Sequence, residues 1–247
     1  MPAATGTWQE IAATLRPPPN SADGPLPPLL LTLTVVTGLV DATSYLKLGH
    51  VFVANMTGNV VFLGFGIAGA GGISIWASLT ALGSFLVGGG QIGARWSSDR
   101  GRHLTATAAT ELLLVAGGLV VAAFSTHQIG TGSRYAVIVL LAVAMGVQNA
   151  AARKLAVPDL TTTVLTMTLT GVAADSALAG GHGSRLARRA LSVAAMLLGA
   201  LIGGLLVLKV DNPAPLALAS GLLAAISFVT YRASRSTPAW ARAGSER

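Results

Sequence analysis

Residues 29–46 read LLLTLTVVTGLVDATSYL, a run of apolar and small residues in which Asp41 is the one charged side chain. As a helix rising about 1.5 Å per residue, this run comes close to crossing the hydrocarbon core of a bilayer. Comparable runs recur along the chain, and lipid offers the backbone no hydrogen-bond partners, so each is expected to be a helix. The eight predicted segments are residues 29–46, 51–70, 73–93, 104–124, 135–152, 160–179, 190–208 and 215–231.

The composition agrees with a membrane protein. The residues are 52% hydrophobic and only 10% charged, whereas a soluble domain carries about 25% charged residues. The net charge of +7 does not indicate nucleic-acid binding, because the basic residues lie in short stretches between the apolar runs. The sequence therefore predicts an all-α, polytopic transmembrane helix bundle with the lipid bilayer as its main partner, and excludes a soluble enzyme.

The chain divides into three parts. Residues 1–28 form a polar arm, residues 29–231 a single transmembrane domain, and residues 232–247 a basic tail. The absence of cysteine excludes disulfides and thiolate chemistry. The four histidines show no metal-ligand spacing, and no nucleotide-binding or hydrolase motif is present, so we expect neither a metal nor a cofactor.

The distribution of basic residues predicts the topology. If all eight segments cross, these residues divide almost evenly between the two sides. Alternatively, the second and sixth segments enter the membrane and return to the same side. One side of the membrane then has only three of the 16 basic residues, Lys47, Arg134 and Lys209. A version in which only the sixth returns gives an equal bias, because it exchanges Arg16 for Lys47. Since basic loops stay in the cytoplasm, we expect six or seven full spans in a bacterial cytoplasmic membrane and a cytoplasmic C-terminus.

The chain carries a short internal similarity. Residues 38–42, GLVDA, resemble residues 146–150, GVQNA, at an offset of 108. Residues 57–59, TGN, can be aligned with residues 166–168, TMT, if one residue is inserted. The alternative is that small residues recur in any membrane helix. With three full spans in each half, 29–124 and 135–231, the second copy would be inverted, as in many secondary transporters.

The stretches 38–45, GLVDATSY, and 51–59, VFVANMTGN, resemble the signature of the YoaK-type family of bacterial inner-membrane proteins, whose function is unknown. Residues 145–153, MGVQNAAAR, together with 163–168 resemble the second block of that family. Met167 departs from the glycine expected opposite Gly58. The resemblance implies a six- or seven-span fold and a role in small-molecule export, and supplies no substrate.

Polar residues inside the apolar segments are the candidate binding residues. An intramembrane carboxyl costs about 2.5–3.5 kcal/mol on insertion scales, so Asp41 is expected to face protein or water; the alternative is an interfacial or helix-capping position. A break at Gly58 would free backbone groups for a ligand, whereas the alternative there is helix–helix hydrogen bonding. The candidates are Asp41, Tyr45, Asn55, Thr57, Gly58, Asn59, Gln148, Asn149, Thr163 and Thr166.

These residues support three hypotheses of function. The first is a secondary transporter, an exporter of a small organic molecule, with proton coupling through Asp41. The second is a membrane scaffold or accessory subunit whose polar residues only hold helices together. The third and weakest is an intramembrane enzyme built on Asp41 and Glu111, although Glu111 is expected to reach the interface or to pair with Arg102. A homo-oligomer is compatible with all three.

Overall fold

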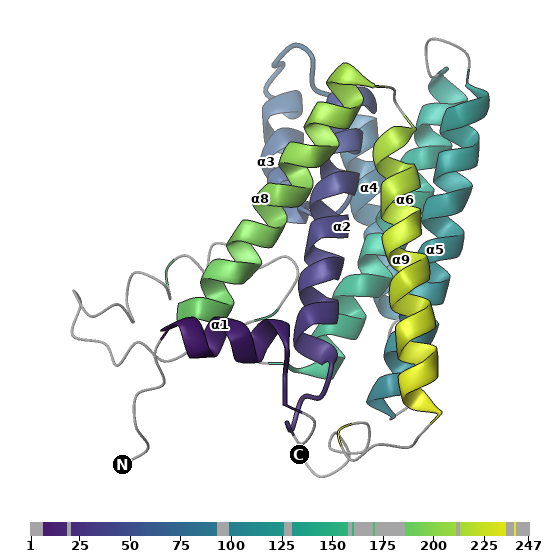
Figure 1. The fold of residues 1–247 in the computed structure, drawn as a ribbon. Helices are drawn as coiled ribbons and strands as arrows, with labels where there is room; N and C mark the ends of the chain where they lie inside the picture. The colour runs from purple at the N-terminus through teal and green to yellow at the C-terminus, as the bar shows by residue number, and fades with distance from the viewer. Residues whose placement is uncertain are drawn as a thin grey trace.

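A computed structural model describes residues 7–18, 21–92, 99–125, 130–157, 160, 170, 186–210, 213–235 and 240. The described elements are all helical and lie side by side as a bundle, with α1 across one end (Figure 1). They are α1 (Thr7–Leu15), α2 (Leu26–Lys47), α3 (Met56–Ile67), α4 (Ile75–Val87), the π-helical turn η1 (Gly88–Ile92), α5 (Arg100–Phe124), α6 (Thr131–Leu155), α8 (Leu186–Lys209) and α9 (Ala214–Ser234).

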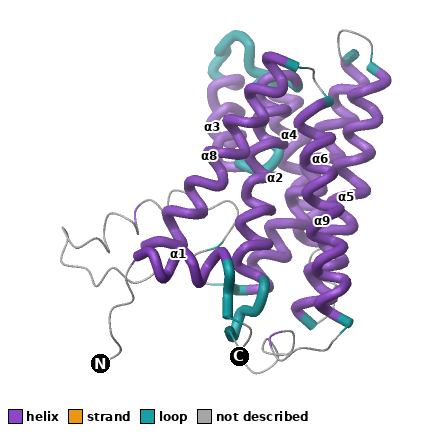
Figure 2. The backbone as a smooth tube through the Cα atoms, viewed as in Figure 1, coloured by secondary structure: helices purple, strands orange, loops and turns teal. Residues whose placement is uncertain are grey.

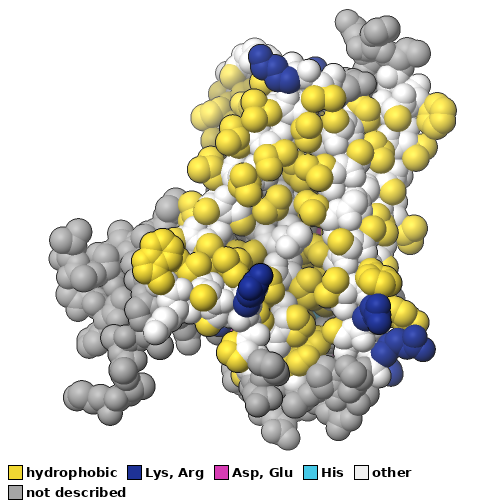
Figure 3. Space-filling model, in the orientation of Figure 1, with side chains coloured by type: hydrophobic (Ala, Val, Ile, Leu, Met, Phe, Trp, Pro, Cys, Tyr) yellow, Lys and Arg dark blue, Asp and Glu magenta, His cyan; other side chains and the backbone are white. Residues whose placement is uncertain are grey.

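The predicted transmembrane bundle is confirmed. Among the residues that the structure describes, five helices are long and apolar enough to cross a membrane: α2, α5, α6, α8 and α9. Apolar side chains dominate the face over α8 and α9 (Figure 3). The first span starts three residues earlier than predicted, at Leu26, because Pro27 lies in the first turn of α2. A proline is tolerated there since the first amides of a helix have no partner within it.

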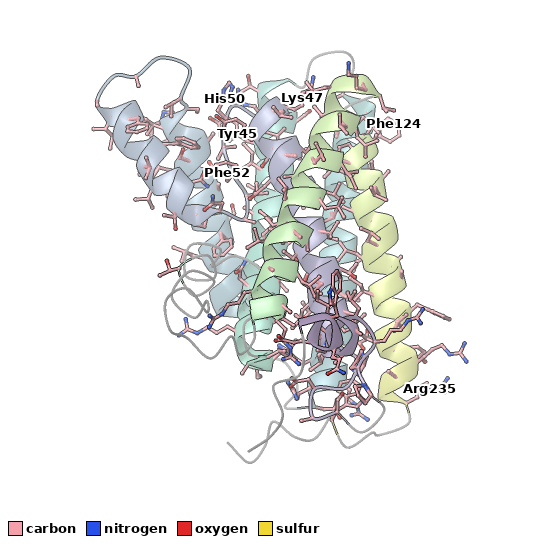
Figure 4. The ribbon with its side chains drawn as sticks, turned by 60° about the vertical axis from the view of Figure 1, so that its left-hand side comes forward. Tyr45, Lys47, His50, Phe52, Phe124 and Arg235 are labelled. Carbon is pink, nitrogen blue, oxygen red and sulfur yellow. The ribbon has the colours of Figure 1, made fainter. Side chains whose placement is uncertain are left out.

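Ion pairs identify one end of the bundle. Asp23, just before α2, lies 3.3 Å from Arg100 at the start of α5 and 3.7 Å from Arg188 at the start of α8. Arg100 also donates to the carbonyl of Leu155 at the end of α6. We call this the basic end; Arg235 lies there, whereas Lys47 and Phe124 lie at the opposite end (Figure 4).

The second apolar segment enters the bundle and returns. The chain leaves α2 at the opposite end, runs inward without helix through residues 51–55, and turns back as α3 (Figures 1 and 2). With 12 residues, α3 is about 18 Å long at 1.5 Å per residue, too short to cross. The alternative that the sequence left open is thus decided in favour of a re-entrant segment, which we define as residues 51–67.

The predicted sixth segment, 160–179, lies outside the described residues except at positions 160 and 170. Its neighbours are nevertheless placed: α6 ends and α8 begins at the basic end, through the contacts of Leu155 and Arg188. Within the described residues, the crossing segments are α2, the α4–η1 run that leads from the opposite end towards α5, α5, α6, α8 and α9, six in all.

Two close helix crossings use glycine. A Cβ on Gly38 of α2 would overlap the backbone of α8, and one on Gly199 of α8 would overlap the backbone at Val35. Likewise α6 meets α4 and η1 through Gly146, next to Phe85, and through Gly88, next to Val143. The positions correspond: Val35 and Gly38 are 108 residues before Val143 and Gly146, and Phe85 and Gly88 are 111 before Met196 and Gly199. Small residues allow such contact between backbones.

Candidate functional site

Asp41 lies inside the bundle and binds the re-entrant segment. Its side chain sits on α2, and the residue is only 3% exposed. Oδ1 accepts hydrogen bonds from the backbone amides of Val53, at 3.0 Å, and Ala54, at 2.9 Å. The carboxyl therefore holds the inward-running part of the segment against α2.

These hydrogen bonds place a carboxylate at the N-terminus of α3. Asn55 occupies the N-cap position but its own side chain makes no capping hydrogen bond. Asp41 supplies an acceptor from another helix to the amides just before that cap, and a negative charge near a helix N-terminus is also favoured by the helix dipole. Asp41 therefore lies beside the start of α3 without capping it, because its hydrogen bonds go to amides that precede the N-cap residue.

Asn59 and Gly58 both contact Phe52 and fix its position. The Asn59 amide pairs with the backbone of Phe52 twice, accepting from its N–H at 2.9 Å and donating to its carbonyl at 2.6 Å. A Cβ on Gly58 would lie 2.9 Å from the Phe52 ring, so glycine leaves room for that ring. Two residues of the predicted cluster thus fix the shape of the re-entrant segment, and the side-chain amide of Asn59 is used inside the protein.

The other two members of that cluster point away from the bundle. Asn55 and Thr57 are exposed at the inner turn of the re-entrant segment, where the extended chain becomes α3. The structure therefore divides the cluster, with Gly58 and Asn59 inward and these two side chains available to water, lipid or a ligand.

An aromatic cluster covers the outer part of the re-entrant segment. Tyr45 stacks on Phe52, with ring centroids 5.0 Å apart, and meets His50 edge-on at 5.2 Å (Figure 4). Phe62 of α3 stacks on Phe52 at 5.7 Å. Of these rings, only Tyr45 was a candidate binding residue from the sequence. The other rings carry no periodic signal, because they come from a loop, an extended stretch and a separate helix.

The second-half candidates are only partly brought to this site. Gln148 is fully buried on α6, and its Nε2 donates to Thr37 Oγ1 of α2 at 2.7 Å. Asn149 is half-buried and donates back to the carbonyl of Met145 in its own helix. Thr37, which the sequence pattern did not indicate as a candidate, therefore joins α2 to α6.

The remaining predictions have different outcomes. Thr163 and Thr166 lie outside the described residues. The expectation for Glu111 is wrong: it is 0% exposed, and within the described part of the chain it forms no ion pair with Arg102. It lies on the buried face of α5 because that face packs between α6 and α9. Across the same described residues, no group of three His, Cys, Asp or Glu side chains could hold a metal ion.

Comparisons with known proteins agree with this architecture. The chain is 38% identical over 148 residues to the UPF0700 transmembrane protein YoaK of Bacillus subtilis (strain 168). That match covers 60% of this chain and 65% of the relative, slightly less than two thirds of its length. No solved structure matches. Residues 29–229 match the family described as protein of unknown function DUF1275, and the chain therefore belongs to this family, as a multi-pass integral membrane protein of the YoaK type.

Proposed function

We propose that this protein is a secondary transporter that exports a small organic molecule across the bacterial cytoplasmic membrane. The observation that carries the proposal is the re-entrant segment, an interrupted helix held at depth in the bundle by Asp41. Irregular backbone within a membrane is tolerated where it is buried in protein or lines a water-filled cavity. Many transporters place such discontinuous helices at the solute site.

The paired glycine crossings support an inverted repeat. The crossing of α2 with α8 matches that of α6 with α4 and η1, at the offsets of 108 and 111. Each half then contributes three crossings, α2, α4–η1 and α5 in the first, and α6, α8 and α9 in the second. An odd number inverts the second half, and alternating access in such folds arises from the rocking of one repeat against the other. In this arrangement Asp41 corresponds to Asn149.

One observation favours the scaffold alternative. Asn59 and Gly58 are used for internal packing around Phe52, as residues that only hold a fold together would be. Asn55 and Thr57 distinguish the two functions, because a transporter needs water to reach the inner turn of the re-entrant segment, whereas a scaffold does not. Catalysis has no part in either proposal.

Water access can be measured with single cysteines, because the natural chain has none. We expect Asn55→Cys and Thr57→Cys to react with a membrane-impermeant maleimide in reconstituted vesicles. Val60→Cys is the matched control: it lies on α3 one turn further along, is 57% exposed, and should be shielded by lipid. Labelling at Val60 but not at Asn55 or Thr57 would favour the scaffold.

Transport itself is tested in the same vesicles. Uptake and efflux of a panel of metabolites and drugs is measured with and without a pH gradient. Under the proposal, maleimide treatment of Asn55→Cys blocks the movement of the transported solute by at least tenfold, while the same treatment of Val60→Cys leaves it unchanged. If no solute in the panel moves, or if both treated variants behave alike, the inner turn is not a transport site.

The orientation is a separate prediction. Lys47, Arg134 and Lys209 lie at the opposite end, because α2 and α8 finish there and α6 starts there. The positive-inside rule then places the basic end, where α9 finishes, in the cytoplasm. A reporter enzyme that works only in the cytoplasm should be active when fused after Arg247, and one that works only outside should be inactive. The reverse pattern would invert the topology.

A further inference from the structure

Glu111 is a buried acid with no partner among the described side chains and backbone. The residue is 0% exposed, and neither carboxyl oxygen has a hydrogen bond within the described structure. Burying an unpaired carboxylate is energetically costly, and ionisable residues inside membrane bundles commonly mark ion or proton pathways. Packing alone does not explain an acid here, because a leucine or methionine would fill the same space without this cost.

The register of α5 against α6 shows where Glu111 lies. Gly118 packs on Leu141, because a Cβ added to Gly118 would lie 3.3 Å from Leu141 Cδ2. Towards the basic end, His103 lies within electrostatic range of Lys154. Since the two helices run antiparallel, Glu111 falls between these points, at the level of Gly146 to Gln148. Glu111 and Gly118 are seven residues apart and so share one helix face.

A second unpartnered acceptor lies at that level. Gln148 and Leu141 are also seven residues apart, which puts Gln148 on the α6 face that meets α5. Its Nε2 is engaged by Thr37, while its Oε1 has no hydrogen bond among the described residues. A protonated carboxyl has one O–H to donate, and Gln148 offers an unused acceptor for it.

Other charged groups are distant from this level. On α6 the titratable residues are Arg134, Tyr135, Arg153 and Lys154, and on α9 they are Tyr231 and Arg232, all in the terminal turns. On α5 itself, Arg100, Arg102 and His103 lie two or more turns nearer the basic end. On α2, Asp41 lies one turn from Thr37 towards the opposite end, followed by Tyr45 and Lys47. No fixed cation on these helices therefore sits beside Glu111.

We propose that Glu111 is a proton-exchange site in the middle of the bundle, with Gln148 as the hydrogen-bond partner of its protonated form. A proton fits better than a metal cation, because a metal needs several oxygen ligands and Glu111 is flanked on its own face by Ala108 and Val115. The step forms and breaks only the O–H bond of the carboxyl, with water as proton donor and acceptor. That this proton is the coupling ion of transport rests on the proposed function. The exchange of the proton at Glu111 does not depend on that function.

Polar groups extend from Glu111 in both directions. Towards the opposite end are Gln148 and then Asp41, whose Oδ2 has no hydrogen bond among the described residues. Towards the basic end, Thr107 and His103 follow at successive turns of α5, and both are buried. Chains of Asp, Glu and His residues of this kind carry protons in pumps and transporters.

The exchange can be tested by infrared spectroscopy of the purified full chain in detergent, with no solute present. We expect wild type to show a carboxylic C=O band in acid buffer that moves in D2O and disappears at alkaline pH. Glu111→Gln should lack this band, and Asp41→Asn should keep it, which assigns the band to one of the two buried acids. If Glu111→Gln does not fold, Glu111→Met provides the same comparison.

Two results would overturn the proposal. Spectra of wild type and the Glu111 variants that are identical at every pH would show that the carboxyl does not titrate. A Glu111 band that is unchanged in D2O would show that its proton is sealed from water. Either result leaves the transporter proposal intact, and failed transport in vesicles would leave the exchange at Glu111 intact, so the two are tested separately.

Discussion

Replacing Asp41 with alanine is expected to lower the free energy of unfolding by about 3 kcal/mol, because the buried amides of Val53 and Ala54 lose the acceptor that both share. The loss should be concentrated in the re-entrant segment, since those two hydrogen bonds hold it against α2. We expect a lower melting temperature in detergent, and faster proteolysis within residues 51–67 than in wild type.

Asp41→Asn is the matched control. The asparagine carbonyl can accept from the same two amides, so most of the stability should remain, at a cost of about 1 kcal/mol for the lost charge assistance. Equal losses for the alanine and asparagine variants would show that charge, and not hydrogen bonding, holds the segment. An alanine variant as stable as wild type would remove Asp41 from the structural role altogether. Whether Asp41 also contributes to coupling stays a prediction, tested by the gradient dependence of the asparagine variant.

The sequence was sufficient to predict the membrane bundle, because apolar length is a linear pattern. It left open whether the second segment spans, because a spanning and a re-entrant second segment give the same asymmetry of Lys and Arg. The extended stretch before α3 could not be located by hydropathy, because residues 51–55 are as apolar as the helix that follows. The extended stretch is held by the carboxyl of Asp41, which lies on another element.

The candidate site was predicted less well, for a related reason. The composition of the second segment marks Asn59 as polar in an apolar run, but does not show that its amide is used by the backbone of Phe52. Glu111 was assigned to the interface from its distance to the end of its segment, whereas α5 extends to Arg100 and places that acid a further turn inside. Burial depends on where a helix begins and on what packs against it, and neither is a local property.

Adding a single methyl group at either glycine crossing is expected to lower the stability of the protein strongly. In Gly146→Ala the new Cβ would overlap the backbone carbonyl of Phe85, and in Gly38→Ala it would lie 2.5 Å from the backbone nitrogen of Ala200. Backbone atoms cannot rotate away as a side chain can, so the helices must separate. We expect each variant to lose about 2–3 kcal/mol of stability, at the upper end of overpacking costs.

Gly83→Ala is the control, because it lies within α4 and its Cβ would meet nothing within 4 Å. Its melting temperature should equal or slightly exceed that of wild type, since alanine has a higher helix propensity than glycine.

The comparison of Gly38→Ala with Gly146→Ala also tests the internal repeat. If the two halves are copies of one unit, these glycines occupy equivalent crossings, and the two losses of stability should be similar in size. A large loss at one glycine and none at the other would show that the crossings are not equivalent, and that the shared offset of 108 residues reflects only the frequency of glycine in membrane helices.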